Sequence, residues 1–133
     1  MSYYIIPDQQ EHCVFLTCTG EMTLAEITTA WQQVLGLLAE MGWNRVLVDI
    51  TALQTNPKTA ELFDLAKLFW LNFPQLGRIA LVVRWEQTRF GKLLEMLVRS
   101  VGMYLTIFVS EERAEAWILE DSAGKQSVEE FAN

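Results

Sequence analysis

The sequence contains little that could hold a metal, a disulfide framework or a nucleotide. It has two cysteines and one histidine, His12, and no ligand residues at zinc-type spacing accompany that histidine. No glycine-rich loop of the dinucleotide or phosphate type follows a predicted strand, and no serine lies in a G-x-S-x-G turn. We therefore predict no cofactor, no bound metal and no catalytic residue.

Long apolar runs and a secretory signal are also missing. No run approaches the roughly 18 residues that a transmembrane span requires. The first seven residues lack the basic region, apolar stretch and cleavage site of a signal peptide. Cys13 and Cys18 lie five residues apart in one predicted strand, so their side chains point to opposite faces and cannot bridge each other. These absences predict a cytoplasmic protein with no transmembrane segment.

What the chain does contain is typical of a folded domain. Its 133 residues are 51% hydrophobic and 20% charged, a balance that excludes disorder. A chain of this length buries enough surface to hold a core without disulfides or bound metals. The net charge of −7 opposes binding to nucleic acid. Residues 78–99 nevertheless hold five basic side chains against two acidic ones. This basic segment could attract an acidic partner, or it could be an ordinary solvated helix face.

Hydrophobic patterning predicts five strands and four helices in the order ββαβαβαβα. The β-rich runs cover residues 3–6, 13–19, 45–50, 78–83 and 104–109. The first two should form an antiparallel hairpin, and the others, separated by single helices, should pair in parallel. The fold class is therefore α/β, a layered domain over residues 1–120 with a mixed five-stranded sheet. Residues 121–133 are expected to form a polar tail in which Val128 and Phe131 could dock.

Local signals place the ends of the predicted helices. Thr23 and Glu26 form a capping box at the first helix, and Gly42 suits its left-handed C-terminal cap. Asn56 is the expected N-cap of the second helix, with Pro57 at its first helical position. The third helix is expected over residues 87–101, with a buried stripe at Phe90, Leu94, Leu97 and Val101.

Polar and aromatic residues gather where the predicted parallel strands end. Open α/β sheets bind ligands outside the carboxyl ends of their strands. Residues of that kind here are Asp49, Thr51, Thr55, Asn56, Lys58, Arg84, Trp85, Gln87, Thr88 and Arg89. We predict a ligand-binding or partner-binding site at Asn56, Lys58, Arg84, Trp85 and Arg89, suited to an anionic group. The alternative is that these are ordinary loop and cap residues.

The predicted second helix is apolar on more than one face. Its core face accounts for some of its apolar residues, yet Phe63, Trp70 and Leu71 extend apolar character nearly around the cylinder. We predict that these three residues form an interface. The covering surface would be a protein partner, a second copy or an apolar ligand.

Three stretches resemble the SpoIIAA-like family, which is related to STAS domains and more distantly to the CRAL-TRIO fold. They are residues 45–49, residues 78–83 and residues 107–118, the last joining a strand that ends in Phe108 and Val109 to Ser110, Ala114 and Trp117. The resemblance implies a STAS-type α/β fold without an established activity. STAS anti-sigma-factor antagonists carry an Asp-Ser-Ser-Gly phosphoacceptor motif, whereas this chain has Asn56-Pro57-Lys58-Thr59-Ala60 at that place.

The sequence leaves three functional classes open. We favour a non-catalytic binding or regulatory module that engages a protein partner and forms a homodimer. The second possibility is a carrier or sensor of an apolar or amphipathic small molecule, held between the second and third helices. The third is an enzyme with its site at the strand carboxyl ends.

Overall fold

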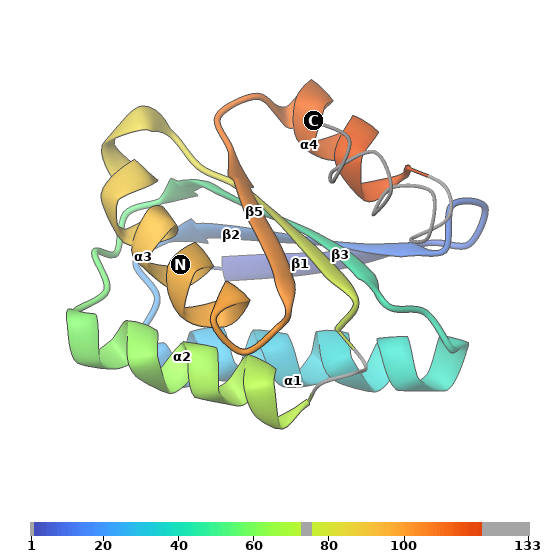
Figure 1. Ribbon diagram of the computed structural model, residues 1–133, viewed down its shortest axis with the longest axis horizontal. Helices are drawn as coiled ribbons and strands as arrows, with labels where there is room; N and C mark the ends of the chain where they lie inside the picture. Colours follow the sequence, from blue (N-terminus) through green and yellow to red (C-terminus); the bar gives the residue numbers. More distant parts are fainter. Residues whose placement is uncertain (1, 73–75, 121–133) are drawn as a thin grey trace.

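The computed structural model describes residues 2–72 and 76–120 and confirms the predicted α/β architecture. One mixed sheet has the strand order β1-β2-β3-β4-β5, with only the β1–β2 pair antiparallel (Figure 1). The strands are β1 (Ser2–Asp8), β2 (Cys13–Gly20), β3 (Arg45–Leu53), β4 (Arg78–Val82) and β5 (Tyr104–Phe108). The predicted tail, with Val128 and Phe131, lies outside the described residues.

The helices cover the two faces of the sheet unequally. They are α1 (Leu24–Met41), α2 (Thr59–Leu71), α3 (Thr88–Arg99) and α4 (Glu111–Ile118), with a 3-10 turn η1 (Trp85–Gln87) before α3. The first three helices pack on one face, and α4 folds back over the other (Figure 1). Among the described residues, no helix combines the length and the apolar character needed to cross a bilayer.

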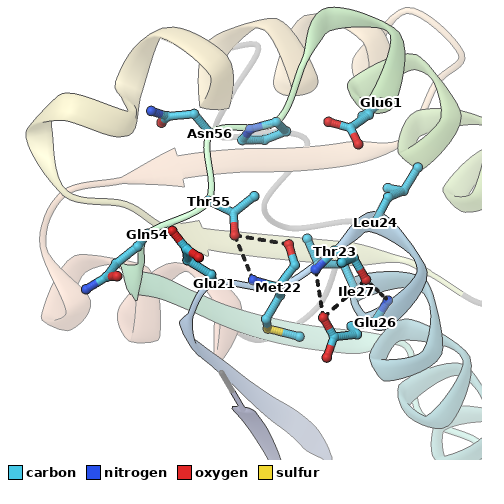
Figure 2. Close-up of a pocket in the computed structure, with 11 residues that line it drawn as sticks. Glu21, Met22, Thr23, Leu24, Glu26, Ile27, Gln54, Thr55, Asn56 and Glu61 are labelled. Atoms are coloured by element: carbon cyan, nitrogen blue, oxygen red, sulfur yellow. Dashed lines mark hydrogen bonds between the residues drawn. The ribbon is translucent and has the colours of Figure 1, made fainter.

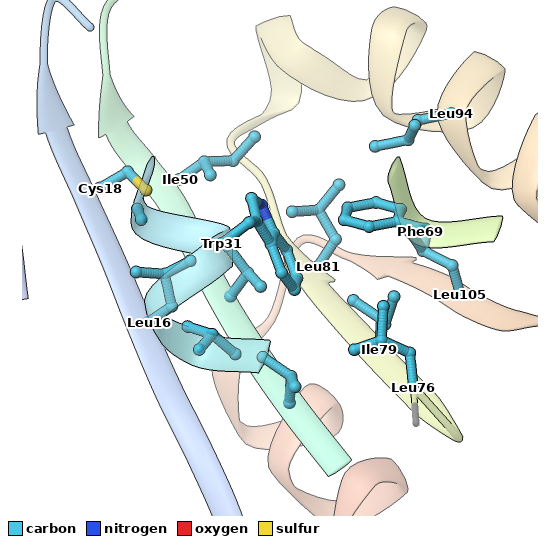
Figure 3. Close-up of a cluster of buried hydrophobic side chains, with 14 of the residues drawn as sticks. Leu16, Cys18, Trp31, Ile50, Phe69, Leu76, Ile79, Leu81, Leu94 and Leu105 are labelled. Atoms are coloured by element: carbon cyan, nitrogen blue, oxygen red, sulfur yellow. The ribbon is translucent and has the colours of Figure 1, made fainter. Parts of the chain in front are cut away.

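Alternation along the strands builds a separate core on each face. The larger core joins the sheet to the three helices, and the buried pair Trp31 and Phe69 meets edge to face at 4.5 Å between ring centroids (Figure 3). Cys18 belongs to this core, whereas Cys13 belongs to the smaller core beneath α4, as their odd spacing predicts. Burial raises the pKa of Cys18 to about 11 and that of Cys13 to about 12, so both thiols are neutral.

The predicted start of the second helix is wrong by two residues. Asn56 does not cap α2; the N-cap is Lys58, whose backbone N–H donates to the Glu61 carboxylate at 2.9 Å. The preceding segment is held by Thr55, whose Oγ1 accepts from the Met22 N–H at 2.7 Å and donates to the Met22 carbonyl oxygen at 3.0 Å. This tie to the loop before α1 competes with helix formation at Asn56, so the helix begins later.

The third helix also differs from its predicted limits. It ends at Arg99, and Val101, predicted to be in the core, is exposed. The buried stripe instead runs through Gly91, Leu94 and Val98. A Cβ at Gly91 would lie 3.3 Å from Ile107 Cγ2, so the helix approaches β5 most closely at this glycine, and Phe90 beside it is only partly buried.

Arginine side chains hold α4 and the edge strand β5 in place by donating hydrogen bonds to backbone carbonyl oxygens. Arg78 donates to the carbonyl oxygens of Trp117 and Glu120 at 2.8 and 2.9 Å, which holds α4 against the sheet. At the edge strand β5, Arg99 Nε donates to the Leu105 carbonyl oxygen at 2.9 Å, and the Ile107 N–H donates to Glu95 at 3.0 Å. Arg78 and Arg99 of the basic segment therefore have structural roles. Side chains of α3 also bind backbone groups of β5 that could otherwise pair with another strand.

Candidate functional site

The carboxyl ends of β3, β4 and β5 meet at one edge of the sheet, as parallel pairing requires. Two surface grooves of opposite charge lie at this edge. Of the five residues of the predicted site, Trp85 and Arg89 line the first groove and Asn56 lines the second, whereas Lys58 and Arg84 line neither. The predicted five-residue site is therefore not one continuous surface.

The first groove is basic and lies between the start of α3 and the β5–α4 connection. Its volume is about 530 Å³, and its lining residues are Trp85, Thr88, Arg89, Lys92, Ile107, Phe108, Val109, Ser110 and Arg113. Three of these are cationic, and none is a carboxylate. Within residues 2–72 and 76–120, none of the three cations makes an ion pair, and all three side chains are exposed. We call this surface the basic groove.

An aromatic surface accompanies the charges of the basic groove. Trp85 is 75% exposed, and Val109 across the groove is also largely exposed. An indole ring exposed to this extent contributes little hydrophobic free energy to folding. Its flat face and single N–H donor suit contact with a partner. The groove thus combines cations with apolar contact area.

Two residues of the basic groove, Lys92 and Arg113, were not among the five residues of the predicted site, although Lys92 belongs to the basic segment 78–99. The spacing of Lys92 was a usable signal, because it lies three and four residues after Arg89 and Thr88 and so shares their helical face. Arg113 offers no comparable signal. It reaches the groove only because the start of α4 and the start of α3 both follow strand carboxyl ends that the sheet brings together, an arrangement that depends on tertiary packing.

Arg84 lies between the two grooves and has internal partners. Its Nη1 donates to the carbonyl oxygens of Thr51 and Leu53, both at 2.8 Å, and its Nε pairs with Glu86 at 3.2 Å. Arg84 is therefore neither a freely solvated charge nor a side chain pointing only at a ligand. It fixes the end of β3 relative to η1 and so positions Trp85.

The buried residue Gln87 also links η1 to the end of β3. Its side chain is 1% exposed, and Nε2 donates to the carbonyl oxygens of Ile50 and Leu53 at 2.8 and 3.0 Å. Its Oε1 accepts from the Arg84 N–H at 2.9 Å. The Gln87 amide thus donates to β3 and accepts from the residue before η1, which gives this residue of the strand-end group a structural role.

The second groove is acidic and lies between the N-termini of α1 and α2 (Figure 2). Its volume is about 580 Å³, and Glu21, Glu26 and Glu61 line it without any lysine or arginine. Glu26 accepts from the Thr23 N–H at 2.8 Å, so two of these carboxylates, Glu26 and Glu61, also serve as helix caps. We call this surface the acidic groove.

The remaining predicted residues of this edge serve mainly local structure. Lys58 is exposed at the α2 N-cap, outside the lining of either groove. The Thr51 N–H and hydroxyl donate to the Asp49 carboxylate at 2.9 and 2.7 Å, so these side chains bond to each other within β3. At the opposite end of the sheet, His12 lies in the β1–β2 turn and stacks on Trp43 at 5.4 Å between ring centroids. No group of three metal-ligating side chains occurs among the described residues.

The outer face of α2 is apolar, as the sequence suggested. Phe63, Trp70 and Leu71 are 54, 53 and 66% exposed, respectively, whereas Leu62 and Phe69 of the same helix are buried. One face of α2 therefore packs in the core while another presents three large apolar side chains to water. We call these three residues the α2 patch.

Comparison with known proteins identifies the fold. No protein-family description matches the chain, and no curated protein is similar to it. The chain is similar to the crystal structure of an uncharacterised protein of the DUF3478 family from Shewanella loihica PV-4, which is described as having a SpoIIAA-like fold. The TM-score is 0.58 at 19% identity, covering 88% of this chain and 92% of the other. This similarity confirms the predicted SpoIIAA-like fold.

Proposed function

We propose that this SpoIIAA-like domain is a non-catalytic binding module, and that its basic groove receives an acidic segment of a protein partner. The observation that carries the proposal is the gathering of Arg89, Lys92 and Arg113 around the exposed Trp85. Three cations without a carboxylate among the lining residues, next to an exposed indole ring, offer charge and apolar contact area together. Trp85 and Arg89 belong to the site expected from the sequence, and Arg84 positions Trp85.

The net charge of the whole molecule favours the basic groove as the place where an acidic segment binds. The chain carries −7, so an acidic segment is repelled by most of its surface and attracted only where cations cluster. Local attraction on a repulsive background favours one docking position, which is how charge contributes specificity. Hydroxyls of Thr88 and Ser110 and the ring of Trp85 supply the neutral contacts of the groove.

A hexaglutamate peptide tests the basic groove directly. At low ionic strength it should bind the full-length protein, and the triple variant Arg89→Ala, Lys92→Ala, Arg113→Ala should weaken binding at least about twentyfold, because close charge pairs each contribute severalfold in affinity. Isothermal calorimetry would measure this, with hexaglutamine as the uncharged peptide.

Matched single variants separate the groove from general attraction. Lys92→Ala should weaken the peptide about threefold to fivefold, whereas Lys67→Ala, which removes an exposed lysine from α2, should leave it unchanged. Likewise Trp85→Ala should weaken binding and Trp70→Ala should not. Equal effects of the two lysine variants would contradict a defined site.

We also propose that the protein forms a homodimer through the α2 patch. Three large apolar side chains on one helix are more than scattered surface residues, and two-fold dimers are the commonest soluble assembly. A symmetric contact would place the α2 helices of two copies against each other and remove Phe63, Trp70 and Leu71 from water.

Trp70→Glu should convert the dimer into folded monomers, because two carboxylates would be buried against an apolar patch across the symmetry axis. Sedimentation velocity at about 100 μM would detect the change, with circular dichroism to confirm folding. Trp85→Glu is the matched control and should remain dimeric. A wild-type protein that sediments as a monomer at this concentration would refute the α2 interface.

A further inference from the structure

An internal cavity lies beneath the acidic groove, between the sheet and the helices α1, α2 and α3. Its volume is about 50 Å³, and apolar side chains such as Trp31, Ile50 and Phe69 form nearly all of its lining (Figure 3). The Cys18 thiol on its wall is neutral because burial raises its pKa to about 11. Such an apolar space holds water poorly.

The cavity and the acidic groove share a boundary. Leu24, Ile27, Pro57 and Glu61 line both spaces, so the first turns of α1 and α2 form the passage between them. Figure 2 shows Leu24 at the start of α1 and Glu61 at the start of α2, on the two helices that border the groove. A molecule with one apolar end and one polar end could therefore occupy both at once.

The cavity volume limits the apolar end of such a molecule. An engineered cavity that accepts benzene has a volume of roughly 150 Å³, about three times that of this cavity. The space therefore suits the end of an unbranched alkyl chain and excludes a ring. The remaining chain would lie along Leu24, Ile27 and Pro57 toward the groove.

The charges of the groove select the polar end. Glu21, Glu26 and Glu61 contribute three negative charges. The N-termini of α1 and α2 oppose them with roughly +0.5 charge each, so a net negative potential remains. A carboxylate or phosphate is disfavoured there, and an ammonium or a neutral hydroxyl is accepted.

We propose that this protein binds a small single-chain amphiphile with a cationic or neutral polar end, its alkyl terminus in the cavity and its polar end in the acidic groove. This site is separate from the basic groove and has the opposite charge preference. It assigns a position and a ligand class to the apolar-ligand alternative that the sequence left open.

Three probes of equal chain length test the proposal: hexylammonium, hexanol and hexanoate. Isotope labelling of isoleucine methyl groups reports where each binds to the full-length protein. Ile27, Ile50 and Ile79 line the cavity, Ile107 lines the basic groove, and Ile118 lies beneath α4. Hexylammonium should shift the three cavity signals and bind at least about tenfold tighter than hexanoate, since each nearby charge changes affinity about fivefold.

A matched pair of carboxylate variants identifies the source of the selectivity. Glu21→Gln should weaken hexylammonium about threefold to fivefold and leave hexanol unchanged. Glu40→Gln removes an exposed carboxylate from α1 outside the groove and should change neither. Ile27→Trp, which enlarges a side chain in the passage, should abolish the shifts of Ile50 and Ile79.

Three outcomes would overturn the proposal. The first is the absence of cavity shifts with all three probes up to their solubility limits. The second is tighter binding of hexanoate than of hexylammonium at the cavity signals. The third is an equal effect of Glu21→Gln and Glu40→Gln. Shifts confined to Ile107 would place alkyl binding in the basic groove and equally exclude the cavity.

Discussion

Replacing Phe69 by alanine should lower the free energy of unfolding by about 3–5 kcal/mol, the range for removing a buried aromatic ring. The ring is 1% exposed and meets Trp31 edge to face at 4.5 Å. Its loss removes dispersion contacts and leaves a void next to the existing cavity. Because the sheet and three helices hold the surrounding side chains, that void should not collapse completely. Urea denaturation would measure the change.

Phe63 provides the matched control on the same helix. Its ring is 54% exposed, so Phe63→Ala should change the stability of the monomer by less than about 0.5 kcal/mol. Measurements at low protein concentration separate this from any effect on association. A loss below about 1.5 kcal/mol for Phe69→Ala would show that α2 packs less closely on the sheet than described.

Replacing Gln87 by glutamate should destabilise the protein by about 3 kcal/mol at neutral pH, because a buried carboxylate would face two carbonyl oxygens and the Arg84 guanidinium, which shares the Leu53 oxygen, would offset only part of that cost. The wild-type amide donates to the carbonyl oxygens of Ile50 and Leu53. A carboxylate has no proton for either, and its negative charge would face two acceptors. The same change should disturb Trp85, because Gln87 and Arg84 together join η1 to the end of β3.

The destabilisation by Gln87→Glu should depend on pH in a defined direction. Burial and the two carbonyl oxygens should raise the pKa of the introduced carboxyl above its unfolded value of about 4.3. The folded state then binds more protons than the unfolded state above that value, so the variant loses stability as the pH rises. The difference from wild type should shrink between pH 7 and pH 5 in urea denaturation.

A conservative pair of variants completes the Gln87 experiment. Gln87→Met keeps the side-chain length without a charge and should cost about 1–3 kcal/mol, independent of pH, for the lost hydrogen bonds. Gln33→Glu changes an exposed glutamine of α1 and should be nearly neutral. A destabilisation by Gln87→Glu that persists unchanged at pH 5 would argue against charge burial as its cause.

The sequence by itself determined the order of elements and which strands run parallel. Alternating and continuous apolar runs produce strands, and a single helix between two strands returns the chain in the same direction, so both follow from local patterns. Which strands are neighbours in the sheet came from the tertiary structure. The capping box at Thr23 and the left-handed cap at Gly42 also follow from nearest neighbours and appear as predicted. The start of α2 did not, because a contact across 33 residues, Thr55 with Met22, decides it.

Tertiary structure alone decided which polar residues share a site. Residues that follow neighbouring strands lie at one edge of the sheet, but Trp85 and Arg89 line a basic groove, Asn56 lines an acidic one, and Lys58 and Arg84 line neither. Arg84 and Gln87 turned inward because carbonyl oxygens at the end of β3 needed donors. Arg113 joined Arg89 because α4 folds back against the sheet. Local sequence patterns indicate which face of a helix or strand a side chain occupies. The hydrogen-bond partner of a polar side chain often belongs to an element far away in the chain. Only tertiary packing brings the two within hydrogen-bonding distance.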